Sequence, residues 1–506
     1  MLATLEQDVL DPSTRLRFKL QPWMPVLVVG ALNLFYIASP GSVELSPDEA
    51  HYWDWSRHLD LCYYSKGPLV AWLIRASTTL FGVTPFGVRF PAVVCGVLIL
   101  LGLIQLCRKH ECWWLLGIVV ALPPFSAASV LMTIDPPLLA CWTWGLVAVV
   151  QRRWKVVGLL LAVGLLAKLT MLLFAVGLLG WLVFTRPMST RGAWQAFAIG
   201  SLGFVPMLIW NLQHDGVSLL HLLGHANNGE SAAPWFSAPV FLAGQFGLLL
   251  GFGFVLCVMG WWNSSRHDPL LWLSAPVLGF FALASVRSNG QANWAAPAYL
   301  GGLVLGLRWW LPRSTVFTRR LLIAGLALGL VASVMVRFPS VVRPILAAVL
   351  PAPTEQKPLP IRQLDPTARL AGWKTLAEAV DRIRFAEEAY NGQPVFLATM
   401  VWTTPGELGF YCAGHPPVYS FGLALADRSS QYDVWHPNPV AEAQAFAGQS
   451  FVYVGEELPK GVCDEFIRMK RVTHTENGVP LASWTIWVGR GYRGFAGVAR
   501  EHPQRY

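Results

Sequence analysis

Charged residues are scarce in this chain. Asp, Glu, Lys and Arg make up 13% of its 506 residues, whereas 54% are hydrophobic. Soluble domains usually carry about 25% charged residues, so the composition excludes an ordinary soluble protein and indicates a membrane protein. The 24 tryptophans agree with this interpretation, because indole rings favour the membrane–water interface.

A cluster of basic residues is also missing. The formal net charge is +9, but Lys and Arg lie mostly in short loops between apolar segments. This distribution argues against a nucleic-acid partner and reports membrane topology instead. The eight cysteines show no CxxC and no zinc-finger spacing. Cys412 and Cys463 share a polar region and could form a disulfide if that region faces an oxidising compartment.

Long apolar segments predict a polytopic α-helical membrane protein with about eleven transmembrane helices. One apolar run is interrupted by Lys168, and two short helices that meet at this lysine explain it better than one helix with a buried charge. The predicted spans are 22–39, 90–107, 113–131, 136–151, 156–167, 169–185, 193–210, 237–262, 269–286, 295–311 and 321–337.

The basic loops predict the orientation of these spans. Groups of Lys and Arg alternate across them and mark the cytoplasmic side. The outer side then receives the loop 40–90, Asp135, Lys168 and everything after Arg337. The cytoplasmic groups include Arg15, Arg17, Lys19, Arg108, Lys109, Arg152, Arg153, Lys155, Arg186, Arg191, Arg266, Arg313, Arg319 and Arg320.

The chain changes character after the last span. We expect a transmembrane domain over 1–340, a Pro-rich linker over 341–364 and a soluble, extracytoplasmic α/β domain over 365–506. In this last domain the pattern predicts a helix over 373–388. It also predicts strands at 394–400, 418–421 and 451–454.

The first outer loop concentrates polar chemistry beside the membrane. Asp48 and Glu49 follow Ser46-Pro47, so they could simply begin a helix with Ser46 as its cap. Alternatively, one of them is a general base that deprotonates an acceptor hydroxyl. We choose Asp48 as this base, because it directly follows the Pro47 turn and has the shorter, better-fixed side chain, and Glu49 then orients a metal, a sugar hydroxyl or a neighbouring helix. Aromatic residues in the same loop are candidate stacking platforms for a sugar: Tyr52, Trp53, Trp55 and Tyr64.

Several outer cations oppose the positive-inside bias. Lys66 and Lys168 each follow or interrupt an apolar run, and we interpret them, together with Arg57, as ligands of a phosphate head group. Arg75 and Arg89 are better explained as snorkelling anchors at helix ends. The segment 68–81 is too short and too polar to span, and it is typical of an interfacial helix.

Two further features lie on the predicted outer side. Asp135 stands at the start of the fourth span, where it could cap a helix or share the acid–base or metal-holding work with Asp48. His214, His221 and His225 lie in one loop. One of them could hold a divalent cation, although no ligand spacing demands it.

Together these motifs resemble the bacterial branch of the protein O-mannosyltransferase-like family, which includes the lipid A aminoarabinose transferases. The resemblance extends over nearly the whole chain, including GWKTLAEAV and SSQYDVW near its end. It is carried by SPDEAHYWDWSRHLDLCYYSKGPLVAWLI, FGVRFPAV, IDPPL, AKLT at 167–170 and ANWAAPAY at 292–299.

The resemblance implies a C-type membrane glycosyltransferase fold that takes sugar from a polyprenyl-phosphate donor. By position, Asp48 or Glu49 matches the catalytic acid of the first loop, and Asp135 matches the second acidic position. Lys66 and Lys168 match lysines of the aminoarabinose branch, Lys66 being the one that binds donor phosphate. The implied location is the bacterial cytoplasmic membrane, with the active site facing outward.

One departure bears on the metal. His225 is similar to a histidine that helps to hold a metal in the aminoarabinose branch, but Ser65 stands where that branch has a metal-binding glutamate. The difference argues against a zinc site and against aminoarabinose as the sugar.

The sequence thus predicts an inverting glycosyltransferase that moves a sugar from a polyprenyl-phosphate donor to a lipid, glycan or protein acceptor. A lipid-phosphate flippase or transporter is the alternative. Transporters usually place charges at mid-membrane and repeat interrupted helices in two halves. Here the charges gather at one face and the sequence shows no internal repeat, so the pattern favours the enzyme.

Overall fold

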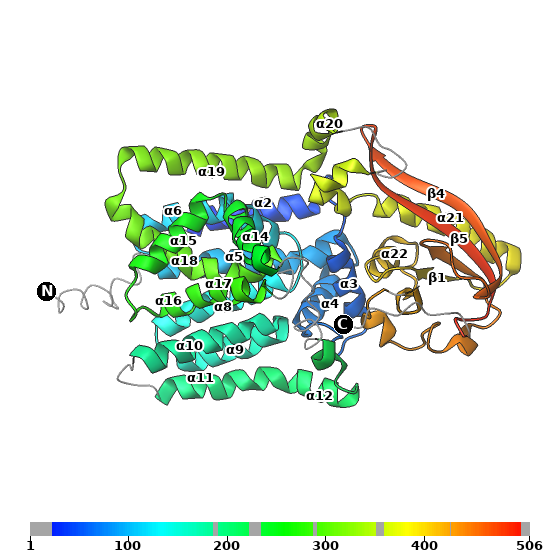
Figure 1. Cartoon of the computed structure of the whole chain (residues 1–506), viewed down its shortest axis with the longest axis horizontal. Helices are drawn as coiled ribbons and strands as arrows, with labels where there is room; N and C mark the ends of the chain where they lie inside the picture. The colour runs from blue at the N-terminus through cyan, green and yellow to red at the C-terminus, as the bar shows by residue number, and fades with distance from the viewer. Residues whose placement is uncertain are drawn as a thin grey trace. The chain divides into compact units, whose positions relative to one another are not determined.

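The computed structural model describes residues 23–185, 191–221, 234–286, 291–350, 359–425 and 427–496 (Figure 1). These residues form two compact units. Unit 1 comprises the described parts of Met1–Ser39, Phe90–Phe204 and Ser231–Ser333. Unit 2 comprises those of Pro40–Arg89, Val205–Glu230 and Val334–Tyr506. The first outer loop therefore belongs to the same unit as the C-terminal region, although more than two hundred residues separate them in sequence.

Unit 1 is built from helices, as its apolar composition predicts. Two of these cross the unit border, because α5 begins and α19 ends within unit 2. The helices are α2 (Trp23–Ala38), α5 (Pro85–Leu106), α6 (Lys109–Ala121), α7 (Pro123–Ala128), α8 (Asp135–Val150), α9 (Trp154–Ala167), η1 (Leu169–Met171), α10 (Leu172–Thr185), α11 (Arg191–Ser201), η2 (Leu202–Phe204), α14 (Pro234–Leu248), α15 (Phe252–Asn263), α16 (Pro269–Trp272), α17 (Ala275–Ala284), η3 (Ala292–Ala295), α18 (Ala296–Trp310), η4 (Leu311–Arg313) and α19 (Val316–Arg337).

Helices occupy all eleven segments predicted to be transmembrane. Among the described residues, three helical segments are long and apolar enough to cross a membrane: Pro85–Leu106, Arg191–Gln213 and Val316–Arg337. A bent pair of helices would add a fourth. The remaining apolar helices are shorter, so the helical class of the protein is confirmed and the number of eleven spans stays a prediction.

The predicted spans 237–262 and 113–131 are broken. The segment 237–262 is wrong as a single helix, because α14 and α15 meet at an angle of 111°. Leu250 and Gly251 adopt positive φ values of 54° and 67° there, which an α-helix does not accommodate. The segment 113–131 divides into α6 and α7 at Pro123, whose ring removes a backbone donor.

The break at Lys168 is confirmed. Lys168 ends α9 with an extended backbone (φ −159°, ψ 134°), and η1 and α10 follow directly. The chain therefore interrupts its apolar run at the one residue whose charge hydrocarbon would not tolerate.

Unit 2 combines the first outer loop with a mixed five-stranded sheet (Figure 1). The strands lie in the order β2-β1-β3-β5-β4, with β1 parallel to β2 and β3, and β5 antiparallel to β3 and β4. The elements are α3 (Pro47–Arg57), α4 (Leu69–Phe81), α12 (Val205–Gln213), α20 (Pro339–Val349), η5 (Pro360–Gln363), η6 (Pro366–Leu370), α21 (Trp373–Asn391), β1 (Phe396–Thr399), α22 (Pro405–Tyr411), β2 (Val418–Ser420), η7 (Gly422–Leu425), η8 (Gln431–Asp433), η9 (Ala443–Phe446), β3 (Phe451–Val454), β4 (Cys463–Glu476) and β5 (Val479–Tyr492).

The sheet confirms the predicted α/β character of the C-terminal region, with α21 and the first three strands where the sequence placed them. Alternate residues of the strands feed two cores. One core contains Leu397 and Val452 with the apolar side of α21 and α22, and the other contains Ala398, Phe421 and Phe451.

This division explains why the considered disulfide does not form. Cys412 lies in the first core, whereas Cys463 packs against the second core. Both are free thiols, because the sheet stands between them.

The predicted linker 341–364 contains ordered structure. Most of α20 lies in its first part and η5 in its last part. Arg343 of α20 is buried in a polar network. This range therefore contributes packed helices to unit 2.

Candidate active site

The acidic pair of the first outer loop begins α3. The Glu49 N–H donates to Ser46 Oγ at 3.2 Å, and the Ser46 N–H donates to Glu49 Oε2 at 2.9 Å. This reciprocal arrangement is a capping box, with Pro47 in the first turn. The expected helix start with Ser46 as its cap is thereby confirmed.

Glu49 is fixed a second time by a buried ion pair. Arg89 Nε and Nη2 donate to Glu49 Oε1 and Oε2, each at 2.8 Å, and both side chains are 0% exposed. The remaining guanidinium donors reach the carbonyl oxygens of Val43 at 2.8 Å and Glu44 at 2.9 Å. The prediction that Arg89 is a snorkelling anchor is wrong, because its whole guanidinium group is buried inside unit 2.

Asp48 has the opposite surroundings. It lies in the first turn of α3 and is exposed, whereas Glu49 beside it is buried. Adjacent side chains on a helix diverge by about 100°, so the fixed Glu49 directs Asp48 outward.

Two of the predicted sugar platforms belong to the core. Trp53 is 2% exposed and packs against Phe410 at a centroid distance of 5.0 Å. Trp55 is 0% exposed and stacks on Tyr63 at 4.3 Å. Since both rings are covered by residues of their own unit, the predicted stacking of a sugar on Trp53 and Trp55 is wrong.

The two tyrosines of that set are also largely enclosed. Tyr52 packs against Trp55 with ring centroids 5.0 Å apart, and Tyr64 lies 4.5 Å from the ring of His221. The Tyr64 N–H donates to Gln431 Oε1 at 2.6 Å. A role for Tyr52 and Tyr64 in substrate binding stays a prediction.

The candidate phosphate ligands of unit 2 differ in their surroundings. Arg57 pairs with Asp54 at 3.2 Å, donates to the His415 carbonyl oxygen at 2.9 Å and lies over the Trp53 ring. The contact with His415 joins the end of α3 to the C-terminal region, whereas the other two contacts lie within the helix. Lys66 is half-buried in the loop before α4, and its backbone oxygen accepts from the Tyr63 N–H at 3.1 Å.

The C-terminal region supplies contacts to α3 and to the residues just before it, and no sequence motif indicated these contacts. Glu44 Oε2 accepts from the Trp373 N–H at 2.6 Å, and the Leu45 N–H donates to the Tyr411 hydroxyl at 2.8 Å. A Cβ atom on Gly406 would lie 2.7 Å from the Ala50 carbonyl, so only glycine permits this approach of α22 to α3.

Glu407 follows Gly406 and is 0% exposed. Burial raises the pKa of this carboxyl well above its usual range, and the nearby Glu44 and Glu49 raise the pKa further. The fold therefore favours the protonated form of Glu407 more than the unfolded chain does. This form spares the acidic start of α3 an additional negative charge.

Unit 1 contains the remaining candidate site residues that the structure describes, Asp135 and Lys168. Lys168 Nζ donates to Asp135 Oδ1 at 2.8 Å, and Asn293 Nδ2 donates to Asp135 Oδ2 at 2.7 Å. The Lys168 and Asp135 side chains are 12% and 15% exposed. The structure thus joins three of the motifs that carried the family resemblance, IDPPL, AKLT and ANWAAPAY.

The histidines give no metal cluster among the described residues. His214 stacks on Trp210 at 4.1 Å, and His221 packs against Tyr64. In the ranges that the structure describes, no three His, Cys, Asp or Glu residues gather around one point. His225 lies outside these ranges, so the possible divalent cation stays a prediction.

The sequence of residues 65–210 matches the family model described as dolichyl-phosphate-mannose-protein mannosyltransferase. A curated relative is the lipid A galacturonosyltransferase RgtD of Rhizobium johnstonii (strain DSM 114642 / LMG 32736 / 3841). It is 32% identical over 285 residues, which are 51% of this chain and 59% of the relative. The chain therefore matches less than two thirds of that protein's length.

Two solved structures share the fold. ArnT from Cupriavidus metallidurans in the apo state aligns with a TM-score of 0.55 at 16% identity. The same protein bound to undecaprenyl phosphate aligns with a TM-score of 0.58 at 14% identity. Each alignment covers 92% of this chain and 97% of ArnT. These matches confirm the resemblance to the protein O-mannosyltransferase-like family that the motifs predicted, and the chain has the C-type membrane glycosyltransferase fold of ArnT.

Proposed function

We propose that this protein is an inverting glycosyltransferase that moves a sugar from a polyprenyl-phosphate donor to an acceptor at the outer face of the bacterial cytoplasmic membrane. The family model is named for a polyprenyl-phosphate sugar donor, and ArnT was crystallised with undecaprenyl phosphate. The relative RgtD is named for transfer to lipid A, which favours a lipid acceptor over a protein. Eleven spans and an outward-facing site remain parts of this proposal.

One observation carries the assignment of the base. Of the two adjacent carboxylates at the start of α3, Glu49 is enclosed with Arg89, whereas Asp48 is exposed. A base must reach the acceptor within hydrogen-bonding distance. Glu49 does not do so, because it is fully buried and its carboxylate is held by Ser46 and Arg89. Asp48 is therefore the proposed base.

The reaction proceeds by a single displacement. The acceptor oxygen or nitrogen attacks the anomeric carbon while Asp48 takes its proton. The bond between the anomeric carbon and the phosphate oxygen breaks, and its electron pair leaves with the polyprenyl phosphate. Lys66 stabilises this departing phosphate by charge-assisted hydrogen bonds. Lys168, held by Asp135, and Arg57 keep their predicted roles as further cations for the donor.

The decisive experiment measures single-turnover sugar transfer and donor binding by the purified protein with Asp48→Asn. Asparagine keeps the size of the side chain but accepts no proton, so transfer should fall by ~10²–10⁴-fold with donor binding kept. The matched control is Asp60→Asn, which changes a carboxylate of the same loop whose partner is the Trp210 indole N–H at 2.7 Å. Normal transfer by Asp48→Asn would contradict the proposal.

A further inference from the structure

α20 has its polar and apolar sides reversed relative to a water-exposed surface helix. Its single charged residue, Arg343, is 2% exposed, whereas Val341, Ile345 and Val349 are 71%, 66% and 80% exposed. An amphipathic helix on a soluble protein turns its apolar stripe to the core and its charges to water. A different medium on the outer side of α20 explains the reversal.

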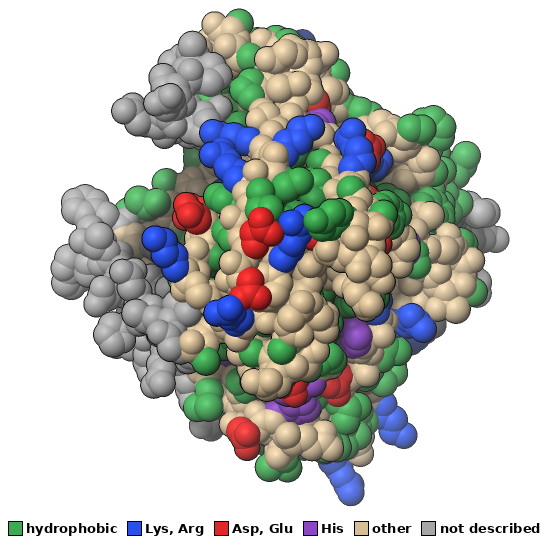
Figure 2. Space-filling model, turned by 90° about the vertical axis from the view of Figure 1, so that its right-hand side faces the viewer, with side chains coloured by type: hydrophobic (Ala, Val, Ile, Leu, Met, Phe, Trp, Pro, Cys, Tyr) green, Lys and Arg blue, Asp and Glu red, His purple; other side chains and the backbone are tan. Residues whose placement is uncertain are grey.

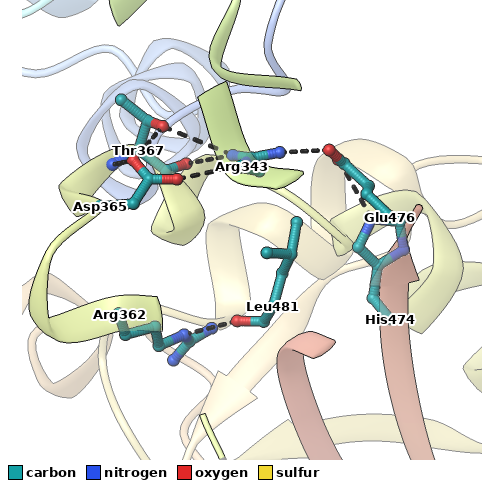
Figure 3. A network of polar contacts seen from close by, with 7 residues as sticks. All are labelled: Arg343, Arg362, Asp365, Thr367, His474, Glu476 and Leu481. Atoms are coloured by element: carbon teal, nitrogen blue, oxygen red, sulfur yellow. Dashed lines mark hydrogen bonds and ion pairs between the residues drawn. The ribbon is translucent and has the colours of Figure 1, made fainter. Parts of the chain in front are cut away.

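The buried side of α20 is attached by a polar network, shown in Figure 3. Arg343 donates to Asp365 at 3.0 Å and to the Thr367 carbonyl oxygen at 3.1 Å, and it forms an ion pair with Glu476. Glu476 in turn contacts His474 on β4 at 3.4 Å. Since Arg343 has these partners, α20 is fixed to the C-terminal part of unit 2 in one rotational orientation.

Apolar contacts support the same orientation. Leu346 and Leu350 pack against a small buried cluster that contains Ile361, Ala368, Ala371 and Leu481. The opposite side of the helix presents an apolar strip, whose residues recur about once per helical turn. They are Val341, Pro344, Ile345, Ala348 and Val349. No charged residue interrupts this strip.

The strip continues from a helix that is itself apolar and exposed. α19 is one of the segments long and apolar enough to cross a membrane, and only 17% of its most apolar window is buried within the protein. Its last turns expose Val331, Val334 and Met335. It ends at Arg337, and a single residue separates it from α20.

The face in Figure 2 is different from this strip. It carries Lys, Arg, Asp and Glu side chains interspersed with apolar ones, as expected of a surface in water. An apolar strip without charges, directly after a membrane-spanning candidate, is instead the pattern of a helix that lies in the plane of a membrane interface.

We propose that α20 lies along the bilayer surface, with Val341, Ile345 and Val349 inserted at the boundary between head groups and acyl chains. The Arg343 network then attaches the C-terminal part of unit 2 to the membrane at this helix. The partner is the lipid bilayer. The inference concerns membrane attachment and does not depend on the proposed glycosyl transfer.

The test places a photoreactive benzophenone amino acid at Ile345 or Val349 of the full chain, in vesicles of phosphatidylethanolamine and phosphatidylglycerol. After irradiation, mass spectrometry counts covalent lipid adducts. The control carries the same residue at Phe385 of α21, which is 49% exposed in the same unit. We expect roughly tenfold more lipid adducts at Ile345 and Val349 than at the control position.

Equal lipid yields at all three positions would overturn the proposal, and so would cross-links to a second copy of the chain. A probe at Val341 provides a second measurement. Its lipid adducts should fall several-fold when Ile345→Asp and Val349→Asp are added, provided that circular dichroism shows an unchanged fold. An unchanged yield with these two charges present would also contradict membrane insertion.

Discussion

Two ion pairs carry the acidic motifs of this protein, and they differ in access to solvent. The Glu49–Arg89 pair of unit 2 is 0% exposed on both sides and has four hydrogen bonds around the guanidinium. The Asp135–Lys168 pair of unit 1 retains 15% and 12% exposure. Enclosure fixes the first pair, whereas partial exposure lets the second exchange a partner for a ligand. We infer that the Glu49–Arg89 pair positions α3 and that the Asp135–Lys168 pair binds the donor.

Breaking the enclosed pair should have the largest effect on stability. Arg89→Met leaves the Glu49 carboxylate buried without its counter-charge, which costs about 3–5 kcal/mol in comparable cases. Thermal unfolding in detergent measures the loss. The double variant Arg89→Met with Glu49→Gln should recover much of it, because no uncompensated charge remains. A single variant as stable as the parent would show that the pair contributes little.

Breaking the partly exposed Asp135–Lys168 pair should affect binding more than stability. Lys168→Met removes a charged hydrogen-bond donor worth about 1.5–3 kcal/mol to a phosphate, so donor affinity should fall about tenfold to a hundredfold. The control is Arg308→Met, which removes another exposed pair of unit 1, with Asp268 at 3.3 Å. Equal donor affinities of the two variants would mean that Lys168 serves only the protein's own structure.

The contact between α22 and α3 offers a third test, which separates the positioning of α3 from the binding of the donor. Gly406→Ala adds a Cβ that meets the Ala50 backbone at 2.7 Å, and such overpacking typically costs about 1–3 kcal/mol. Transfer should fall because α3 shifts, while the partly exposed Asp135–Lys168 pair of unit 1 keeps its donor affinity. The control is Gly41→Ala in the same unit, where the structure shows nothing within 4 Å of the new atom and the backbone does not have a positive φ.

The smallest effect should come from Glu407→Gln and should depend on pH. The raised pKa of Glu407 in the folded protein means that folding favours its protonated form. Stability from this group is complete below the pKa of the unfolded chain, near 4.5, and is lost as pH rises through the folded pKa. Glutamine carries no charge at any pH, so the variant should be more stable than the parent at pH 8, with a gap that closes toward pH 4.5.

Thermal unfolding of both proteins across this pH range measures the gap. A difference that does not change with pH would contradict a raised pKa of Glu407. Transfer should stay close to that of the parent, because glutamine keeps the size of the side chain.

Local patterns predicted much of the fold. Ser46 as a cap, the break at Lys168 and the first three strands follow from short-range rules of capping, burial and alternation. The β4–β5 hairpin was missed, although its signal was present. Asn477-Gly478 adopts positive φ values of 50° and 80° between two alternating segments, and an Asn-Gly pair is the strongest short signal of a hairpin.

The candidate site was less predictable because its decisive contacts are distant in sequence. A charged residue at the start of an apolar helix resembles a snorkelling anchor, and only the three-dimensional structure reveals that Arg89 reaches Glu49, forty residues earlier. Likewise, Trp53 and Trp55 resemble a sugar platform until Phe410 and Tyr63 cover them. Composition identifies such residues, whereas burial decides what they do.

Unit 2 is built from three separate stretches of chain, and this has a consequence for biosynthesis. Glu44 and Leu45 leave the ribosome early, but their partners Trp373 and Tyr411 follow 329 and 366 residues later. Domains form during translation from the N-terminal end, yet the residues just before α3 obtain these two contacts only after nearly the whole polypeptide exists. A prematurely terminated chain that ends within the last apolar helices would therefore present the Asp48 segment without the supports that orient it, and it would be inactive in the membrane.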